Sequence, residues 1–214
     1  MFSVIIPTMW KINFKDQLQL LTKLSLVKEI LIINNDKNTT PDWFLTLNDD
    51  KLIEVRPQSN IFVNPAWNLG VRLAKCDHIF LNSDDVIVNS YDFISHIYEK
   101  ISNEDCLIGC SESCYTYTLP DNPLIIDEVG NRPYGYGCMF FFPKKSFKPL
   151  PEQFKIWYGD DFLFQIFKSK NKAKSISQIN MSQTKTGATT IHVLPVCRQD
   201  ETMGYNSTLI EYLK

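Results

Sequence analysis

The sequence lacks any apolar run that approaches the roughly 18 consecutive residues of a membrane-spanning helix. Its first residues, MFSVIIPTMW, form a short apolar stretch that contains a proline, without a preceding basic run or a cleavage site. We therefore expect a cytoplasmic chain with no signal peptide and no membrane span. A formal net charge of −2 over 214 residues supplies no field that would recruit nucleic acid, so we expect no nucleic-acid partner.

The six cysteines lack the spacing of a zinc finger, and in a chain without a signal peptide we expect reduced thiols rather than disulfides. Cys106, Cys110 and Cys114 recur at every fourth residue. In an extended strand these positions share one face, so small buried thiols explain the pattern. A metal site is the alternative.

Short β-branched runs alternate with amphipathic segments in the first half of the chain, which predicts strands joined by helices. An α/β fold with a mostly parallel central sheet flanked by helices follows from this alternation. With 44% hydrophobic residues, the chain is long enough for one core, and we expect one domain over 1–214. The predicted strands are 2–7, 29–34, 51–56 and 78–82, and the predicted helices between them lie in 14–27, 41–47 and 65–75.

The second half of the sequence is less regular. Residues 115–135 form a long segment rich in Pro, Tyr and Asn, and a segment of this length is typical of a binding loop or a lid, with disorder as the alternative. Residues 181–190 show no apolar periodicity and are predicted to form a mobile loop that could order over a bound nucleotide. The predicted helices here are 91–101 and 160–170, and the predicted strands are 105–113, 138–143 and 173–179.

Polar residues follow several of the predicted strands, at the edge where parallel sheets bind ligands. The strongest case is HIFLNSDDVIV, in which an apolar strand runs directly into Asp84 and Asp85. Carboxylates at this place cost stability unless a cation or hydrogen bonds compensate them. Mg²⁺ or Mn²⁺ held by one or two carboxylates and substrate phosphates fits, and an Asp-capped turn is the alternative.

The order of several segments resembles the family 2-like, inverting glycosyltransferases of the GT-A fold, over nearly the whole chain. The segments that carry the resemblance are FSVIIPT, EILIINND, PQSN with NPAWNLGVRLA, FLNSDDVIV, GYGCMFFFPKKSF and WYGDDFLFQIF. The resemblance implies a Rossmann-like nucleotide-diphospho-sugar transferase. Its nucleotide-binding half would cover about 1–90 and its acceptor-side half about 91–214.

The resemblance also implies roles for acidic residues and one histidine. Asn82-Ser83-Asp84 occupies the place of the metal-binding Asp-x-Asp, so Asp84 is the expected Mn²⁺ or Mg²⁺ ligand, with Asp85 second. His192 resembles a C-terminal histidine that meets the metal or pyrophosphate, with a structural histidine as the alternative. Asp160-Asp161 stands where the family has Glu-Asp, which makes Asp161 the general base and Asp160 an orienting group. Capping of a helix is the alternative for this pair.

Amide side chains after the second strand can pair with a pyrimidine edge, so the resemblance implies a UDP- or dTDP-sugar donor of the glucose or rhamnose type. The acceptor would be a hydroxyl of a glycan or glycoprotein, with a hexosyltransferase activity. Trp157, Tyr158, Tyr134 and Tyr136 flank the acceptor side, where they could stack on sugars or fill the core. The implied nucleotide contacts are Pro7, Thr8, Asn34, Asn35, Asp36, Asn60, Asn68, Ser83 and Asp84.

Two other functions remain open from the sequence. A sugar-phosphate nucleotidyltransferase would need a glycine-rich loop after the first strand, but residues 7–10 read PTMW. A non-catalytic sugar-nucleotide or glycan-binding module would not need both Asp84 and Asp161. The compact size of the chain and its end at Lys214 are consistent with one catalytic domain among others of a longer polypeptide.

Overall fold

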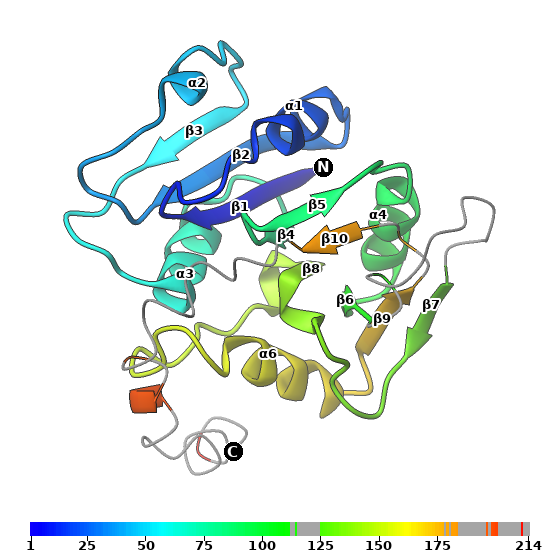
Figure 1. The fold of residues 1–214 in the computed structure, drawn as a ribbon. Coiled ribbons are helices and arrows are strands. Elements are labelled where there is room, and N and C mark those ends of the chain that lie inside the picture. The colour runs from blue at the N-terminus through cyan, green and yellow to red at the C-terminus, as the bar shows by residue number, and fades with distance from the viewer. Residues whose placement is uncertain are drawn as a thin grey trace.

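The computed structural model describes residues 1–111, 114, 125–177, 179, 181–183, 196, 198–200 and 211. Its centre is an eight-stranded sheet in the order β3-β2-β1-β4-β8-β6-β9-β7 (Figure 1). The four strands at one end are mutually parallel, and β8 and β7 run antiparallel to their neighbours. The strands are β1 (Phe2–Thr8), β2 (Val27–Asn34), β3 (Leu52–Val55), β4 (His78–Asn82), β6 (Leu107–Cys110), β7 (Ile125–Glu128), β8 (Met139–Pro143) and β9 (Ala173–Ser177).

Helices cover both faces of this sheet, because alternate strand residues point to opposite sides and both sides are apolar. One core packs α1 and α4 on the sheet, and the other packs α3 and α6 on it (Figure 1). The predicted α/β architecture with a mostly parallel sheet is therefore confirmed. The helical segments are α1 (Lys15–Lys23), α2 (Asp42–Leu45), α3 (Val63–Leu73), α4 (Ile94–Asn103), η1 (Tyr136–Cys138), η2 (Lys144–Ser146) and α6 (Gly159–Lys168).

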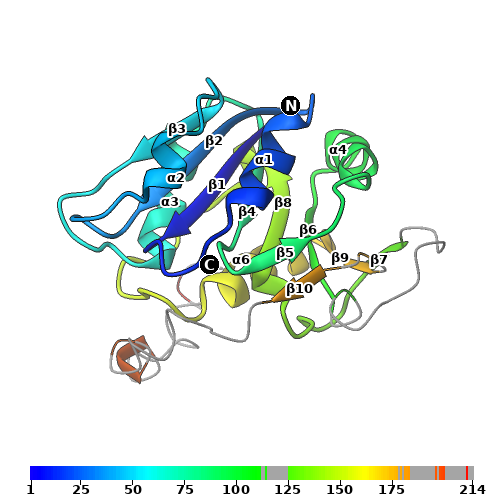
Figure 2. The same cartoon turned by 45° about the horizontal axis from the view of Figure 1, so that its top comes forward.

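The loop predicted for 181–190 is wrong at its start. Met181–Gln183 form β10, which pairs antiparallel with β5 (Val86–Val88) in a separate two-stranded ribbon (Figure 2). Met181 is buried in the core, so a tertiary contact fixes a segment too short to show a strand period. The other residues of the predicted lid, 184–190, lie outside the described part of the chain.

The long irregular segment predicted for 115–135 also contains a strand. Ile125–Glu128 form β7, which pairs antiparallel with β9 at the edge of the sheet. Ile125 is among the more exposed apolar residues, as a strand at a sheet edge allows. Residues 115–124 are not among those described.

The cysteine pattern has a different basis from the predicted one. β6 ends at Cys110, whereas Cys114 is helical and its backbone N–H donates to the carbonyl of Ser111. One strand therefore does not carry all three thiols. Cys106, Cys110 and Cys114 are nevertheless buried, as small core residues are.

None of the helices in the described part of the chain is long and apolar enough to cross a membrane.

Candidate active site

A cleft opens where the carboxyl ends of β1 and β4 meet. These strands are parallel neighbours, and β8 runs antiparallel beside β4 with Asn82 opposite Met139. The residues before β8 therefore lie at the same edge, and α6 begins beside them. The cleft measures about 320 Å³, and its lining residues are Pro7, Val63, Trp67, Ser83, Asp84, Asp85, Tyr134, Gly135, Gly137, Cys138, Ile156, Trp157 and Asp160.

Asp84 is held at the floor of the cleft by the end of β1. The Thr8 hydroxyl donates a hydrogen bond of 2.7 Å to Oδ2 of Asp84 and accepts one of 2.9 Å from the N–H of Trp10. Loss of surrounding water, with a smaller contribution from Asp85, raises the pKa of Asp84 to about 7. Thr8 and Asp84, two of the implied nucleotide contacts, are thus in direct contact, and Pro7 lines the same cleft.

The other residues of the acidic run are ordered around Asp84. Ser83 and Asp85 both line the cleft, and the Ser83 N–H bonds to the carbonyl of Cys138 at 3.0 Å. Asn82 is buried, and within the described residues its Oδ1 has no hydrogen-bond partner. An unpaired buried oxygen near two carboxylates can coordinate a hard cation or accept a hydrogen bond from an N–H group of a ligand.

A second carboxylate group lies at the head of α6. Asp160 and Asp161 share the guanidinium of Arg132, with distances of 2.9 Å from Nη1 to Asp160 and 2.7 Å from Nε to Asp161. Loss of water and then the charge of Asp161 raise the pKa of Asp160 to about 6, against the opposing effect of Arg132. Asp160 lines the cleft close to Gly137, where an added Cβ would lie 2.8 Å from its Oδ2.

Arg132 was not predicted from the sequence. It lies in the Pro- and Tyr-rich segment that was expected to form a binding loop, and that composition was its only signal. Asp161, unlike Asp160, is not among the residues that line the cleft.

The polar end of β2 is bound within the protein. Asn34 is buried, and its Nδ2 donates to Glu54 at 2.6 Å and to the carbonyl of Thr39 at 2.9 Å. Its Oδ1 accepts the N–H of Asp36. Asn35 accepts the N–H of Ile61 at 3.1 Å. A nucleobase bound at this edge would therefore contact side chains that already form hydrogen bonds within the protein.

Asn60 and Asn68 differ in their surroundings. Oδ1 of Asn60 accepts the N–H of Phe62 at 2.8 Å, and its Nδ2 lies 3.6 Å from the sulfur of Met9. Asn68 makes two bonds to the backbone of Leu150, of 2.8 and 2.9 Å, and is not a lining residue of the cleft. A nucleotide contact by Asn68 would have to replace these bonds.

The residues that could hold a metal are few. Within the described residues, no three His, Cys, Asp or Glu side chains gather closely enough to hold an ion by themselves. Asp84 and Asp85 with phosphate oxygens remain the donor set that fits Mg²⁺ or Mn²⁺. His192 lies outside the described residues.

The aromatic residues near the cleft fall into two kinds. Tyr136 is fully buried, and its hydroxyl donates to the carbonyl of Lys174 at 2.8 Å, so it belongs to the core. Tyr134 is 78% exposed at the rim, and Trp157 lines the cleft. Trp157 and Tyr134 are thus two aromatic residues that a ligand in the cleft can reach.

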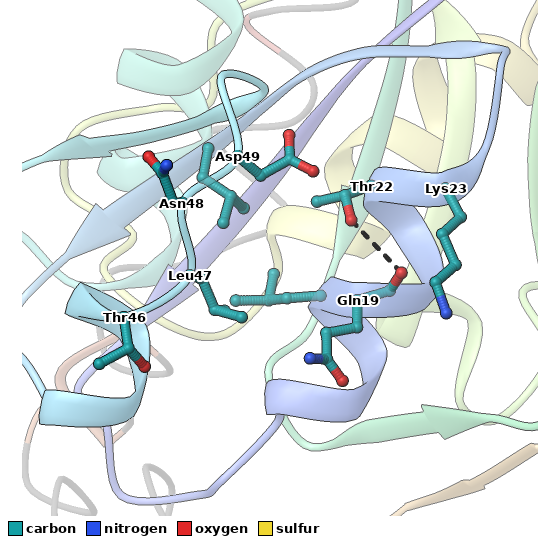
Figure 3. A pocket seen from close by; sticks show the side chains of 9 residues that line it. Gln19, Thr22, Lys23, Thr46, Leu47, Asn48 and Asp49 are labelled. Carbon is teal, nitrogen blue, oxygen red and sulfur yellow. Dashed lines mark hydrogen bonds between the residues drawn. The ribbon is translucent and has the colours of Figure 1, made fainter.

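A second hollow, of about 360 Å³, lies between α1 and the segment before β3. Figure 3 shows Gln19, Thr22 and Lys23 on the helix side of this hollow, with Leu47, Asn48 and Asp49 on the opposite segment. It contains no pair of neighbouring carboxylates and none of the predicted site residues. We therefore take the cleft at the ends of β1 and β4 as the candidate active site.

Structural comparison identifies the fold. No protein-family model matches the sequence, and a search of characterised proteins by sequence finds no match. Residues 1–349 of S. aureus TarS superpose with a TM-score of 0.62 at 13% identity, covering 92% of this chain and 64% of that one. The same protein in complex with UDP gives a TM-score of 0.58 at 15% identity, covering 83% of this chain and 58% of that one.

The mannosyltransferase PcManGT from Pyrobaculum calidifontis, in complex with GDP-Man and Mn²⁺, gives a TM-score of 0.59 at 12% identity. This match covers 83% of this chain and 54% of the mannosyltransferase chain. The chain has the GT-A fold of these glycosyltransferases, and it spans less than two thirds of the length of each of these three solved chains.

Proposed function

We propose that the chain is a metal-dependent, inverting glycosyltransferase that moves a sugar from a nucleotide diphosphate donor to a hydroxyl acceptor. One observation carries the proposal: a single cleft brings Asp84 and Asp85 of the β4 end together with Asp160 of the α6 head. Solved chains of the same fold support it, since one is in complex with UDP and another with GDP-Man and Mn²⁺. Residues 1–214 would act as one domain, with the donor on the side of about 1–90.

Asp84 and Asp85 would hold Mn²⁺ or Mg²⁺, which when bound neutralises charge on the diphosphate leaving group. Thr8 orients the Asp84 carboxylate through its 2.7 Å hydrogen bond. Trp157 and Tyr134 offer aromatic faces to a sugar ring.

We assign proton abstraction from the acceptor hydroxyl to Asp161 and orientation of the acceptor to Asp160, which lines the cleft. Attack of the deprotonated oxygen on the anomeric carbon, opposite the diphosphate, inverts the configuration at that carbon. The guanidinium of Arg132 holds both carboxylates at the head of α6. The positive charge of Arg132 opposes the rise in the pKa of Asp160 that burial and Asp161 cause.

A thermal-shift panel tests the proposal. UDP-, dTDP- and GDP-sugars are added with Mn²⁺, with Mg²⁺ or with a chelator, to the wild type and to Asp84→Asn. We expect at least one donor to stabilise the wild type only when the metal is present, and to lose that effect in the variant. No stabilisation by any donor under any of these conditions would rule the proposal out.

The two sequence-based alternatives make different predictions in the same panel. A nucleotidyltransferase would be stabilised by a nucleoside triphosphate more than by a nucleotide sugar. A binding module would be stabilised by a nucleotide sugar but would release no nucleoside diphosphate on incubation with sugar acceptors.

A further inference from the structure

A buried carboxylate near the end of the chain holds one wall of the cleft. Asp200 is fully buried, and its carboxylate accepts three hydrogen bonds of 2.9 Å from consecutive backbone N–H groups. Oδ1 accepts the N–H of Lys155, and Oδ2 accepts those of Ile156 and Trp157. Successive N–H groups that converge on one anion form a nest, in which charge strengthens each bond.

Asn64, in the first turn of α3, binds the same segment through its carbonyls. The backbone N–H of Asn64 donates to the carbonyl of Lys155 at 3.0 Å, and its Nδ2 donates to the carbonyl of Trp157 at 2.9 Å. The backbone of residues 155–157 is therefore held from two sides: its N–H groups donate to Asp200, and two of its carbonyls accept from Asn64.

The segment leads directly into the head of α6. Tyr158 has φ 66° and ψ 0°, a left-handed conformation that a tyrosine adopts only when its neighbours impose it. Gly159 follows, and a Cβ there would lie 2.1 Å from Oδ1 of Asn64. Any movement of residues 155–157 would thus be transmitted to Asp160.

We propose that Asp200 is a positioning residue, which draws residues 155–157 into the nest and so sets both the Ile156–Trp157 wall and the start of α6. Its consequence for sugar transfer rests on the proposed function, in which Trp157 presents an aromatic face to a sugar ring. A carboxylate suits this task because all of its lone pairs accept. An amide at position 200 would turn an NH₂ group toward one of the three donors.

The experiment uses Asp200→Asn in the full chain, with the four tryptophans labelled with fluorine and observed by NMR. Trp157→Phe assigns the resonance of Trp157. We expect the Trp157 resonance to shift and broaden in Asp200→Asn while the other three keep their positions. Hydrogen exchange at the amides of 155–157 should accelerate by about tenfold or more. Glu152→Gln removes the same charge from an exposed neighbour of the segment and should change neither signal.

An unchanged Trp157 resonance with unchanged exchange at 155–157 would overturn the proposal. Simultaneous collapse of all four resonances would overturn it as well, because Asp200 would then support the whole fold rather than this wall. No substrate is needed for either measurement. Failure of every donor to bind, with the expected Trp157 response, would count against the proposed function alone.

Discussion

Two groups of carboxylates border the cleft, and they are compensated in different ways. Asp84 receives a hydrogen bond from the neutral hydroxyl of Thr8, and burial raises its pKa to about 7. Asp160 and Asp161 share the positive charge of Arg132. The head of α6 thus has a cation supplied by the chain, whereas the end of β4 is the place where a cation from solution would gain most.

The largest expected effect separates the two groups by their roles. Asp84→Asn and Asp161→Asn should each reduce transfer by about 10² or more, because one removes a proposed metal ligand and the other the proposed base. Donor binding in the presence of Mn²⁺, measured by calorimetry, should be lost only in Asp84→Asn. Equal loss of donor binding in both variants would contradict the division of roles. Asp92→Asn, an exposed change of the same kind, is the control.

The next effect concerns stability with a chelator present. The pKa of Asp84 is raised in the folded state, so the unfolded chain binds fewer protons between pH about 4 and about 7. The wild type should therefore lose stability as the pH rises through this range, by about 4 kcal/mol, and change no further from this cause above pH 7. Asp84→Asn should lack this loss. Denaturant unfolding of both proteins across the range measures it, and parallel curves would show that Asp84 ionises normally.

Arg132 provides a test of the internally compensated group. Arg132→Gln removes the positive charge that opposes the rise in the pKa of Asp160, so that pKa should increase further. Because the orienting group Asp160 would then stay protonated to higher pH, the acid limb of the pH–rate profile should move to higher pH, with transfer at neutral pH falling by about tenfold. The acid limb of Arg132→Lys should lie between those of the wild type and Arg132→Gln. A uniform loss at every pH, with no displacement of the limb, would point to a packing role instead.

The smallest effect tests the link between β1 and β4. Thr8→Val removes the hydrogen bond to Asp84 and should weaken donor binding with Mn²⁺ by about 1 kcal/mol, since the carboxylate loses its fixed orientation. Thr8→Ser keeps the hydroxyl and should bind as the wild type does. Calorimetry on the two variants measures the difference. Weaker binding by both would indicate that the methyl group, not the hydrogen bond, matters.

Local patterns predicted much of the fold and part of the site. The apolar runs of β1, β2 and β4 were read correctly because each strand is buried on both faces and stands out in composition. Parallel pairing then required the ends of β1 and β4 to adjoin, and Thr8 does bond to Asp84. The apolar period after Asp160 likewise marked the start of α6.

By itself, the sequence thus determined the α/β sheet and the carboxylates at its edge, because these depend on side-chain periods and on strand ends. Only the tertiary structure decided the pairing of Arg132 with Asp160, the contact of Asp200 with residues 155–157 and the strand at Met181. Each joins segments 28 or more residues apart through two or three contacts. So few contacts between distant segments leave no period in the sequence, and the folded chain alone selects them.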